Sequence, residues 1–133
     1  MLTDPIADFA TRVRNCLSIE AAHVDVADSA FKRKIAATLQ REGFIWDYEC
    51  IPNACGMFSV LRMNLKYGPS GERVVRSIKR VSSPGRRVYY GYDRMPRVLG
   101  GLGILVLSTN QGVLSSREAV SRRLGGEALL EVW

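Results

Sequence analysis

The stretch GILVLSTNQGVLSSREA, residues 103–119, passes from wholly apolar to polar side chains within one short segment. Its first part, Ile104 to Leu107, predicts a buried strand, because a short apolar run next to glycine is typical of one. Small polar side chains follow directly, at Ser108, Thr109 and Asn110. Gln111-Gly112 then predicts a turn. We therefore expect a buried strand whose exit carries hydrogen-bonding groups.

The residues after this turn predict a short helix and a final strand. Ser115 and Glu118 have the spacing of a capping box, in which the serine hydroxyl bonds the backbone of Glu118 and the carboxylate bonds back to Ser115. We expect the helix to end at Gly125 or Gly126, since glycine commonly ends helices. Residues 127–133 predict the last strand.

Strands also dominate the region before the opening stretch. Two are predicted, at residues 74–81 and 86–92, joined by Ser82-Ser83-Pro84-Gly85. The polar break at residues 68–71, with the sequence GPSG, is the best candidate for a boundary. The pattern therefore predicts two small lobes, residues 1–67 and residues 68–133. The second lobe is expected to be mostly β, with one short helix.

Two helices are predicted in the first lobe. Their ends are marked by a cap at Thr3 or Asp4 with Pro5 beside it, a cap at Asp28 or Ser29, and a stop at Gly43. Apolar residues at helical spacing give the inward positions Ile6, Ala10, Val13 and Leu17 in the first helix and Phe31, Ile35 and Leu39 in the second.

The same lobe is expected to hold a short sheet. One strand is predicted at residues 23–27, and two more at 44–50 and 57–67, where apolar and polar residues alternate. The turn residues Pro52, Asn53 and Gly56 lie between the last two, so these are expected to form a hairpin. Helices packed on a short sheet, followed by a mostly β lobe, give an α+β fold.

Composition restricts the class of protein. The chain has 133 residues, of which 47% are hydrophobic, but no apolar run approaches the ~18 to 20 residues that cross a bilayer. The N-terminal residues lack the features of a secretory signal, so we expect an intracellular protein with no membrane partner. The three cysteines contain no CxxC pair, so we expect no disulfide framework, no metal and no cofactor. They are Cys16, Cys50 and Cys55.

The net charge of +6 is concentrated in residues 67–97, because acidic and basic residues balance on either side of this segment. Within it, only Glu72 and Asp93 oppose the basic residues, which are Arg73, Arg76, Lys79, Arg80, Arg86, Arg87, Arg94 and Arg97. The segment also carries Tyr67, Tyr89, Tyr90 and Tyr92. Basic residues interleaved with aromatic rings favour nucleic acid as the partner over a surface that only keeps the protein soluble.

Catalytic signals are weak. The single histidine, His23, has no evident acid or nucleophile partner. The glycines of residues 100–103 precede a strand and have no following Lys-Ser/Thr, so they do not form a phosphate loop. We therefore expect that the chain is not an enzyme.

The opening stretch, followed by Gly125-Gly126-Glu127, resembles the C-terminal signature of the bacterial small-subunit ribosomal protein eight family. Further similar segments follow the order of that family along the chain: Asp4 to Asp8, Thr11 to Asn15, Glu42 to Ile45, Leu65 to Tyr67, and Arg80 to Gly85. The resemblance covers nearly the whole chain. Several spaced motifs in the right order are more specific than one Ser-Thr pair.

This resemblance implies a structural protein that binds the central domain of small-subunit ribosomal RNA and helps its assembly. The family binds RNA mainly through its Ser/Thr loop and its Gly-Gly-Glu segment. Carried onto this chain, those positions are Ser108, Thr109, Gly112, Gly125, Gly126 and Glu127. Asn110 stands where the family usually has serine, but an amide can both donate and accept. Further implied partners are neighbouring small-subunit ribosomal proteins and the protein's own messenger RNA, in a cytoplasmic or organellar ribosome.

The residues independently support the same interpretation. An A-form helix presents 2′-hydroxyls in a shallow minor groove, so short polar groups near the protein backbone suit it. Arg86, Arg87 and Tyr89 of the basic segment complete the predicted RNA-binding set. Two simpler roles stay open: residues 108–112 as a polar turn and Gly125-Gly126 as a helix stop. A repressor of its own messenger and, less favoured, an RNA-modifying enzyme are the alternative functions.

Overall fold

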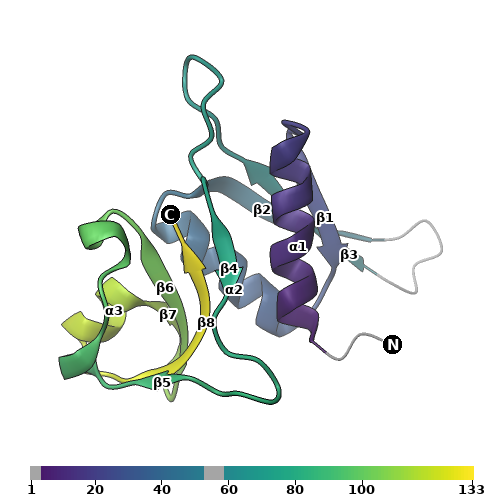
Figure 1. Ribbon diagram of the computed structural model, residues 1–133. Coiled ribbons are helices and arrows are strands. Elements are labelled where there is room, and N and C mark those ends of the chain that lie inside the picture. Colours follow the sequence, from purple (N-terminus) through teal and green to yellow (C-terminus); the bar gives the residue numbers. More distant parts are fainter. Residues whose placement is uncertain (1–3, 53–58) are drawn as a thin grey trace. The chain divides into compact units, whose positions relative to one another are not determined.

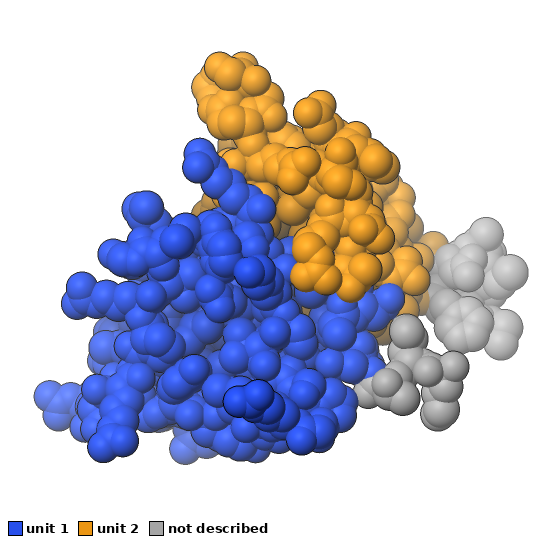
Figure 2. All heavy atoms as spheres, in the orientation of Figure 1, with its two compact units in different colours: residues 1–10, 76–133 blue, residues 11–75 orange. Residues whose placement is uncertain are grey.

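The computed structural model describes residues 4–52 and 59–133. The chain forms two compact units, which Figure 2 shows in different colours. Unit 1 comprises residues 1–10 and 76–133, and unit 2 comprises residues 11–75. The division into lobes 1–67 and 68–133 stays a prediction.

Helix α1 (Pro5–Ser18) begins in unit 1 and ends in unit 2. Asp4 caps it, because its Oδ1 accepts hydrogen bonds of 3.2 Å from the backbone N–H groups of Ile6 and Ala7. Thr3, the alternative cap, lies outside the described residues. The buried side chains of α1 are Phe9, Ala10, Val13 and Leu17. Ile6, one of the predicted inward positions, is only half-buried.

Helix α2 (Ala30–Arg41) has the predicted cap and stop. The Ser29 hydroxyl accepts a hydrogen bond of 3.2 Å from the backbone N–H of Lys32. Gly43 follows the helix with a φ of +82°, the left-handed conformation that glycine adopts readily at a helix end. The predicted Ile35 and Leu39 are buried.

One predicted inward position of α2 is wrong. Phe31 is 36% exposed, whereas Lys32 is only 8% exposed. The ammonium group of Lys32 donates to the carbonyl of Ala27 at 3.2 Å. The first turn of α2 therefore turns a hydrogen-bonded lysine inward, as a lysine can be when its ammonium group finds an acceptor and its aliphatic stem is buried.

Unit 2 contains one three-stranded antiparallel sheet, with strand order β1-β3-β2 (Figure 1). Its strands are β1 (His23–Ala27), β2 (Ile45–Pro52) and β3 (Ser59–Leu65). The pairing of β2 with β3 confirms the predicted hairpin, although its turn residues Asn53 and Gly56 lie outside the described residues. Helix α2 packs against β2 and β3.

The start of β2 contains a bulge that shifts the predicted alternation. Ile45 pairs with Leu65, whereas Asp47 pairs with the preceding residue, Asn64, so Trp46 is the extra residue. Ile45 is buried and Trp46 is 59% exposed. A bulge reverses the faces on either side of it, so simple alternation fails here.

Unit 1 is built around a five-stranded antiparallel sheet (Figure 1). Its strands are β4 (Ile78–Arg80), β5 (Tyr89–Tyr90), β6 (Ile104–Thr109), β7 (Gly112–Ser115) and β8 (Gly126–Val132). Four follow the order β4-β8-β6-β7, and β5 pairs with β8. The strands predicted at 104–107 and 127–133 are confirmed, and so is the α+β fold class.

The predicted strands at 74–81 and 86–92 are shorter than expected, and both pair with β8. Residues 83–87 leave the sheet between them as an outward loop, which we call the arginine loop. The buried Ser82 closes its neck, because its hydroxyl accepts from the N–H of Val88 at 2.9 Å and donates to the Val88 carbonyl at 3.2 Å. β4 and β5 therefore form one edge strand along β8, which the arginine loop interrupts. They do not form a hairpin with each other, because both hydrogen-bond to β8.

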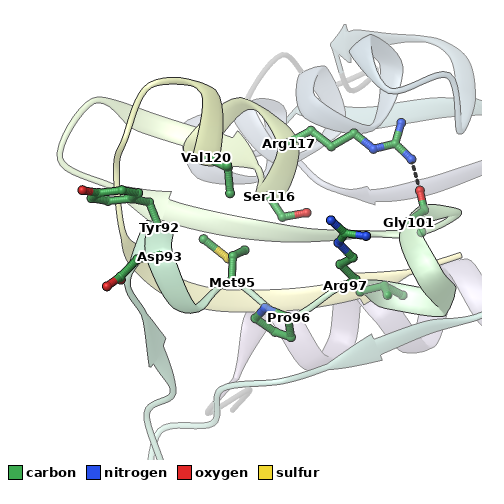
Figure 3. A pocket seen from close by; sticks show the side chains of 11 residues that line it. Tyr92, Asp93, Met95, Pro96, Arg97, Gly101, Ser116, Arg117 and Val120 are labelled. Atoms are coloured by element: carbon green, nitrogen blue, oxygen red, sulfur yellow. Dashed lines mark hydrogen bonds between the residues drawn. The ribbon is translucent and has the colours of Figure 1, made fainter.

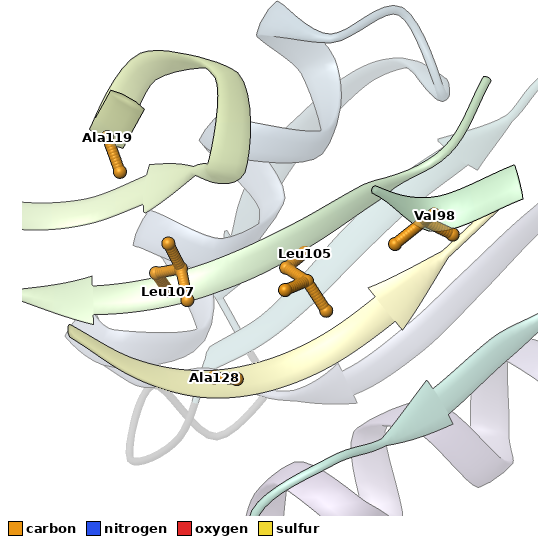
Figure 4. Packing of buried hydrophobic residues seen from close by; sticks show 5 residues of the cluster. All are labelled: Val98, Leu105, Leu107, Ala119 and Ala128. Carbon is orange, nitrogen blue, oxygen red and sulfur yellow. The ribbon is translucent and has the colours of Figure 1, made fainter. Parts of the chain in front are cut away.

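Helix α3 (Ser116–Ser121) has the predicted capping box, but its predicted end is wrong. Arg122 caps the helix and Arg123 takes a φ of +56°, so the helix ends before either glycine. Ala119 of α3 packs with buried residues of the sheet and of the 3-10 turn η2 (Val98–Gly101), as Figure 4 shows. This cluster comprises Val98, Leu105, Leu107, Ala119 and Ala128.

Candidate nucleic-acid interface

Three of the predicted RNA-binding residues lie in one row across the sheet of unit 1. Tyr89 pairs with Glu127, and Glu127 pairs with Ser108 on the other side of β8. Residues directly opposite each other in antiparallel strands share a face of the sheet. Tyr89, Glu127 and Ser108, which we call the Ser108 row, therefore lie side by side although they come from three strands.

The neighbouring row faces the other side of the sheet. Tyr90 pairs with Gly126, and Thr109 pairs with Gly112. Successive side chains of a strand point to opposite faces, so Ser108 and Thr109 do not share a surface. Tyr90 accordingly packs against the buried cluster beneath α3. Ser108 and Thr109 are adjacent in the sequence, which suggests that their hydroxyls act side by side. The alternation of the strand instead places them on opposite faces of the sheet.

The two hydroxyls also differ in their bonds. Thr109 Oγ1 donates to the carbonyl of Gly112 at 2.8 Å and accepts from the N–H of Gln111 at 3.2 Å, so it holds the turn after β6. Ser108 is half-buried, and its hydroxyl makes no hydrogen bond within residues 4–52 and 59–133. Of the two hydroxyls, that of Ser108 therefore keeps its donor and both of its acceptor sites for hydrogen bonds to a ligand.

Glu127 is held in place by the arginine loop. Arg87 Nη1 lies 2.9 Å from Glu127 Oε2, and the side chains are 48% and 17% exposed respectively. The hydrogen bond to Glu127 and the negative charge of this carboxylate raise the pKa of Arg87 above its usual value. A carboxylate has about four acceptor sites, so Glu127 can hold Arg87 and still accept from a ligand.

The predicted basic segment separates into structural and exposed residues. The side chain of Arg80 is only 12% exposed, and it donates to Asp4 at 3.1 Å and to the carbonyl of Leu129 at 3.0 Å. Arg86, in contrast, is exposed in the arginine loop, and in the described part of the chain its side chain forms no ion pair or hydrogen bond. Tyr89, which follows this loop, is 68% exposed.

The three predicted glycines are glycine for different physical reasons. A Cβ at Gly126 would lie 2.3 Å from the carbonyl oxygen of Ser108, and one at Gly125 would lie 2.7 Å from the carbonyl oxygen of Tyr90. Both glycines thus allow close approach of protein backbone. Gly112 has a φ of +111°, and a Cβ at this position would meet no described atom within 4 Å, so its backbone is open toward a ligand.

Sequence reasoning missed the role of Ser82. Its hydroxyl positions both the arginine loop and, through Val88, the start of β5 that carries Tyr89. A small hydroxyl next to a Ser-Pro-Gly turn was the only local signal. Asn110 is exposed in the turn after β6, and its RNA-binding role stays a prediction.

Known proteins resemble this chain over its full length. A family model described as ribosomal protein S8 matches residues 4–133. The chain belongs to the ribosomal protein S8 family. Relatives named small ribosomal subunit protein uS8 are 51% identical in Rhodopirellula baltica over 132 residues, 48% in Caldicellulosiruptor bescii over 130 and 49% in Geobacillus kaustophilus over 133. These alignments cover 98 to 100% of this chain and 97 to 99% of each relative.

Membership of the S8 family confirms the resemblance noted from the sequence, and the names of the relatives confirm that the chain is not an enzyme. Among the residues that the structure describes, no helix is long and apolar enough to span a membrane. The RNA-binding roles of individual residues stay predictions at this point.

Proposed function

We propose that this S8-family protein is a structural constituent of the small ribosomal subunit that binds the central domain of small-subunit ribosomal RNA directly and helps its assembly. The names of its relatives support the small subunit as its place. The observation that carries the RNA-binding proposal is the Ser108 row, which joins an exposed aromatic ring, a positioned carboxylate and a hydroxyl with no bond in the described chain.

Each member of the Ser108 row has a distinct chemical use on folded RNA. The ring of Tyr89 offers a stacking surface to an unpaired base. Glu127 accepts from a base amino group or a 2′-hydroxyl, and its ion pair with Arg87 limits its repulsion of nearby phosphates. The Ser108 hydroxyl both donates and accepts, as a 2′-hydroxyl does.

The surroundings of the row add charge and close approach. Arg86 supplies an exposed cation in the arginine loop for a phosphate. Asn110 and the open backbone at Gly112 extend the polar surface beyond the end of β6. Thr109, Gly125 and Gly126 contribute by holding the turn and the strands that position these groups.

The remaining partners follow from the same proposal. Neighbouring small-subunit ribosomal proteins would contact the protein within the subunit, and its own messenger RNA would bind the Ser108 row if it contains a similar folded site. We expect the protein in the ribosome of the cytoplasm.

The test measures RNA affinity by filter binding with a fragment of the central domain of small-subunit ribosomal RNA. Ser108→Ala is expected to weaken binding, because it removes a hydroxyl without removing a hydrogen bond of the fold. Ser121→Ala is the matched control, since Ser121 is an exposed serine of the same unit outside the row. Equal affinities for both variants and the wild type would reject the Ser108 row as the RNA site.

Sucrose-gradient sedimentation of a cell lysate tests the place of the protein separately. Sedimentation with small subunits is expected. A protein that stays at the top of the gradient, free of small subunits, would favour the regulatory alternative instead.

A further inference from the structure

Unit 1 contains a pocket that the Ser108 row does not use. It has a volume of about 360 Å³ and lies among the 3-10 turn η1 (Tyr92–Arg94), the turn η2 and helix α3 (Figure 3). The volume is near the lower end for ligand pockets in proteins, so the pocket suits one small group and not an extended partner surface. No residue of the predicted RNA-binding set lines it.

The two ends of the pocket have different chemistry. Tyr92 and Asp93 stand at one end, and the guanidinium groups of Arg97 and Arg117 lie toward the other, with Met95 between them (Figure 3). Tyr92 is 45% exposed. One end of the pocket therefore carries an aromatic ring and a carboxylate, and the other end carries two positive charges.

The two arginines at the cationic end differ in how firmly the protein holds them. Arg117 Nη2 donates to the carbonyl of Gly101, which orients its guanidinium at the rim. Arg97 is exposed, and its side chain forms no ion pair or hydrogen bond in the part of the chain that the structure describes. Asp93 lies at the opposite end of the pocket (Figure 3). An anionic group of a ligand therefore finds an oriented cation and an adaptable one.

We propose that this pocket holds a single unstacked nucleotide, with its base against Tyr92 and its phosphate between Arg97 and Arg117. Asp93 accepts from an amino group of the base, while Met95 and Val120 cover the apolar faces of base and sugar. Arginine binds phosphate well because its planar fork makes paired hydrogen bonds.

An acidic peptide is the competing occupant, and the lining argues against it. A carboxylate beside the aromatic ring repels an acidic peptide, whereas it matches the amino edge of a base. The pocket also offers a flat ring at the end opposite the cations, which suits a base joined to a phosphate. A residue of an RNA strand and a nucleotide free in solution present the same groups, so the experiment distinguishes these two sources.

This proposal goes beyond the proposed function, because η1, η2 and α3 form the pocket and the Ser108 row does not contribute to it. The two proposals therefore fail separately. Loss of the Ser108 hydroxyl is expected to leave the pocket unchanged, and loss of Arg97 is expected to leave the Ser108 row intact.

The experiment follows the Tyr92 ring and Val120 methyl resonances of the full isotope-labelled chain by nuclear magnetic resonance. Adenosine monophosphate, uridine monophosphate and a single-stranded RNA about four nucleotides long are titrated in turn. Saturable shifts at both residues are expected in the wild type. Arg97→Ala is expected to weaken the affinity about tenfold, because it removes a charged hydrogen-bond donor.

Arg122→Ala is the matched control, since Arg122 is an exposed arginine next to α3 that does not line the pocket. It is expected to keep the wild-type affinity. Val120→Phe, which fills the pocket from a residue that is already 44% exposed, is expected to abolish the shifts of the Tyr92 ring, the reporter that remains in this variant, without unfolding the protein.

The outcomes separate the sources. Binding of the monophosphates supports a free nucleotide as a ligand, and binding of the short RNA alone supports a residue of an RNA strand. Absence of shifts with all three probes, or equal affinity of Arg97→Ala and wild type, overturns the proposal. Shifts produced by a short Leu-Glu peptide, with none from the nucleotide probes, also overturn it and assign the pocket to a protein segment.

Discussion

Arg87 and Glu127 form an ion pair of 2.9 Å that joins the arginine loop to the start of β8. The pair uses one of the two adjacent arginines of the loop to hold the carboxylate of the Ser108 row. Of these two arginines, Arg86 alone is left with its whole charge facing solvent in the described part of the chain. Two arginines that look equivalent in the sequence therefore have different roles.

This difference predicts distinct salt dependences for the two arginines. Arg86→Ala is expected to weaken binding to all RNAs and to lower the slope of log affinity against log salt by about one, as for one lost phosphate contact. Arg87→Ala is expected to weaken binding with a smaller change in slope, because the charge of Arg87 is already paired with Glu127 and not with a phosphate. Binding measured over a series of KCl concentrations checks this, and an unchanged slope for Arg86→Ala would show that Arg86 does not touch phosphate.

The two hydroxyls of β6 are expected to separate binding from stability. Ser108→Ala should cost ~1 to 3 kcal/mol of RNA affinity and change the free energy of unfolding by less than about 0.5 kcal/mol. Thr109→Ala should lower the free energy of unfolding by about 1 kcal/mol, since it removes the bond to Gly112. Urea denaturation and filter binding of both variants test this, and identical unfolding curves for the two would contradict it.

Gly126 and Gly112 should respond differently to the same substitution. Gly126→Ala is expected to cost about 1 to 3 kcal/mol of stability and to weaken RNA binding, because its Cβ would meet the Ser108 carbonyl at 2.3 Å. Gly112→Ala is expected to strain the backbone by about 1 to 3 kcal/mol without displacing a neighbour. Amide spectra report the difference: shifts at Ser108 are expected for the first variant, and their absence would show that the added Cβ does not displace the Ser108 carbonyl.

Asp4 is expected to make the free energy of unfolding depend on pH. Burial alone would raise its pKa, but the hydrogen bond and charge of Arg80, with the N–H groups of Ala7 and Ile6, hold that pKa below the ordinary 3.8. A lowered folded-state pKa contributes stability that is present above 3.8 and is lost as pH falls through the folded-state value. Asp4→Asn should therefore unfold at lower urea than wild type near neutral pH, and the difference should shrink as the pH falls below 3.8 and through the lowered pKa of Asp4 in the folded protein. A difference that is independent of pH would rule out this contribution.

Local signals in the sequence predicted much of the fold. The caps at Asp4, Ser29 and Ser115 follow from short side chains that accept backbone hydrogen bonds a few residues ahead. The alternation along β3 predicted its buried face, because side chains of a strand alternate with a fixed period. The strand β6 was predicted from an apolar run next to glycine.

Features that depend on partners distant in the sequence were not predicted. The arginine loop arises because β4 and β5 both pair with β8, which comes much later in the chain. The helix α3 ends at Ser121, and Gly125 and Gly126 lie instead where strands approach closely. The alternation of faces in β6 separates Ser108 from Thr109, which adjacency in the sequence conceals.

The neck at Ser82 and Val88 has a consequence for how this protein can change. The arginine loop leaves and rejoins the edge of β8 at neighbouring points, and hydrogen bonds of Ser82 close it there. A segment attached in this way can be exchanged or lengthened while the strand pairs on either side stay in register. Natural variation or design can therefore change the affinity of the protein for a polyanion by replacing the arginine loop alone. The sheet then continues to determine how readily the protein unfolds.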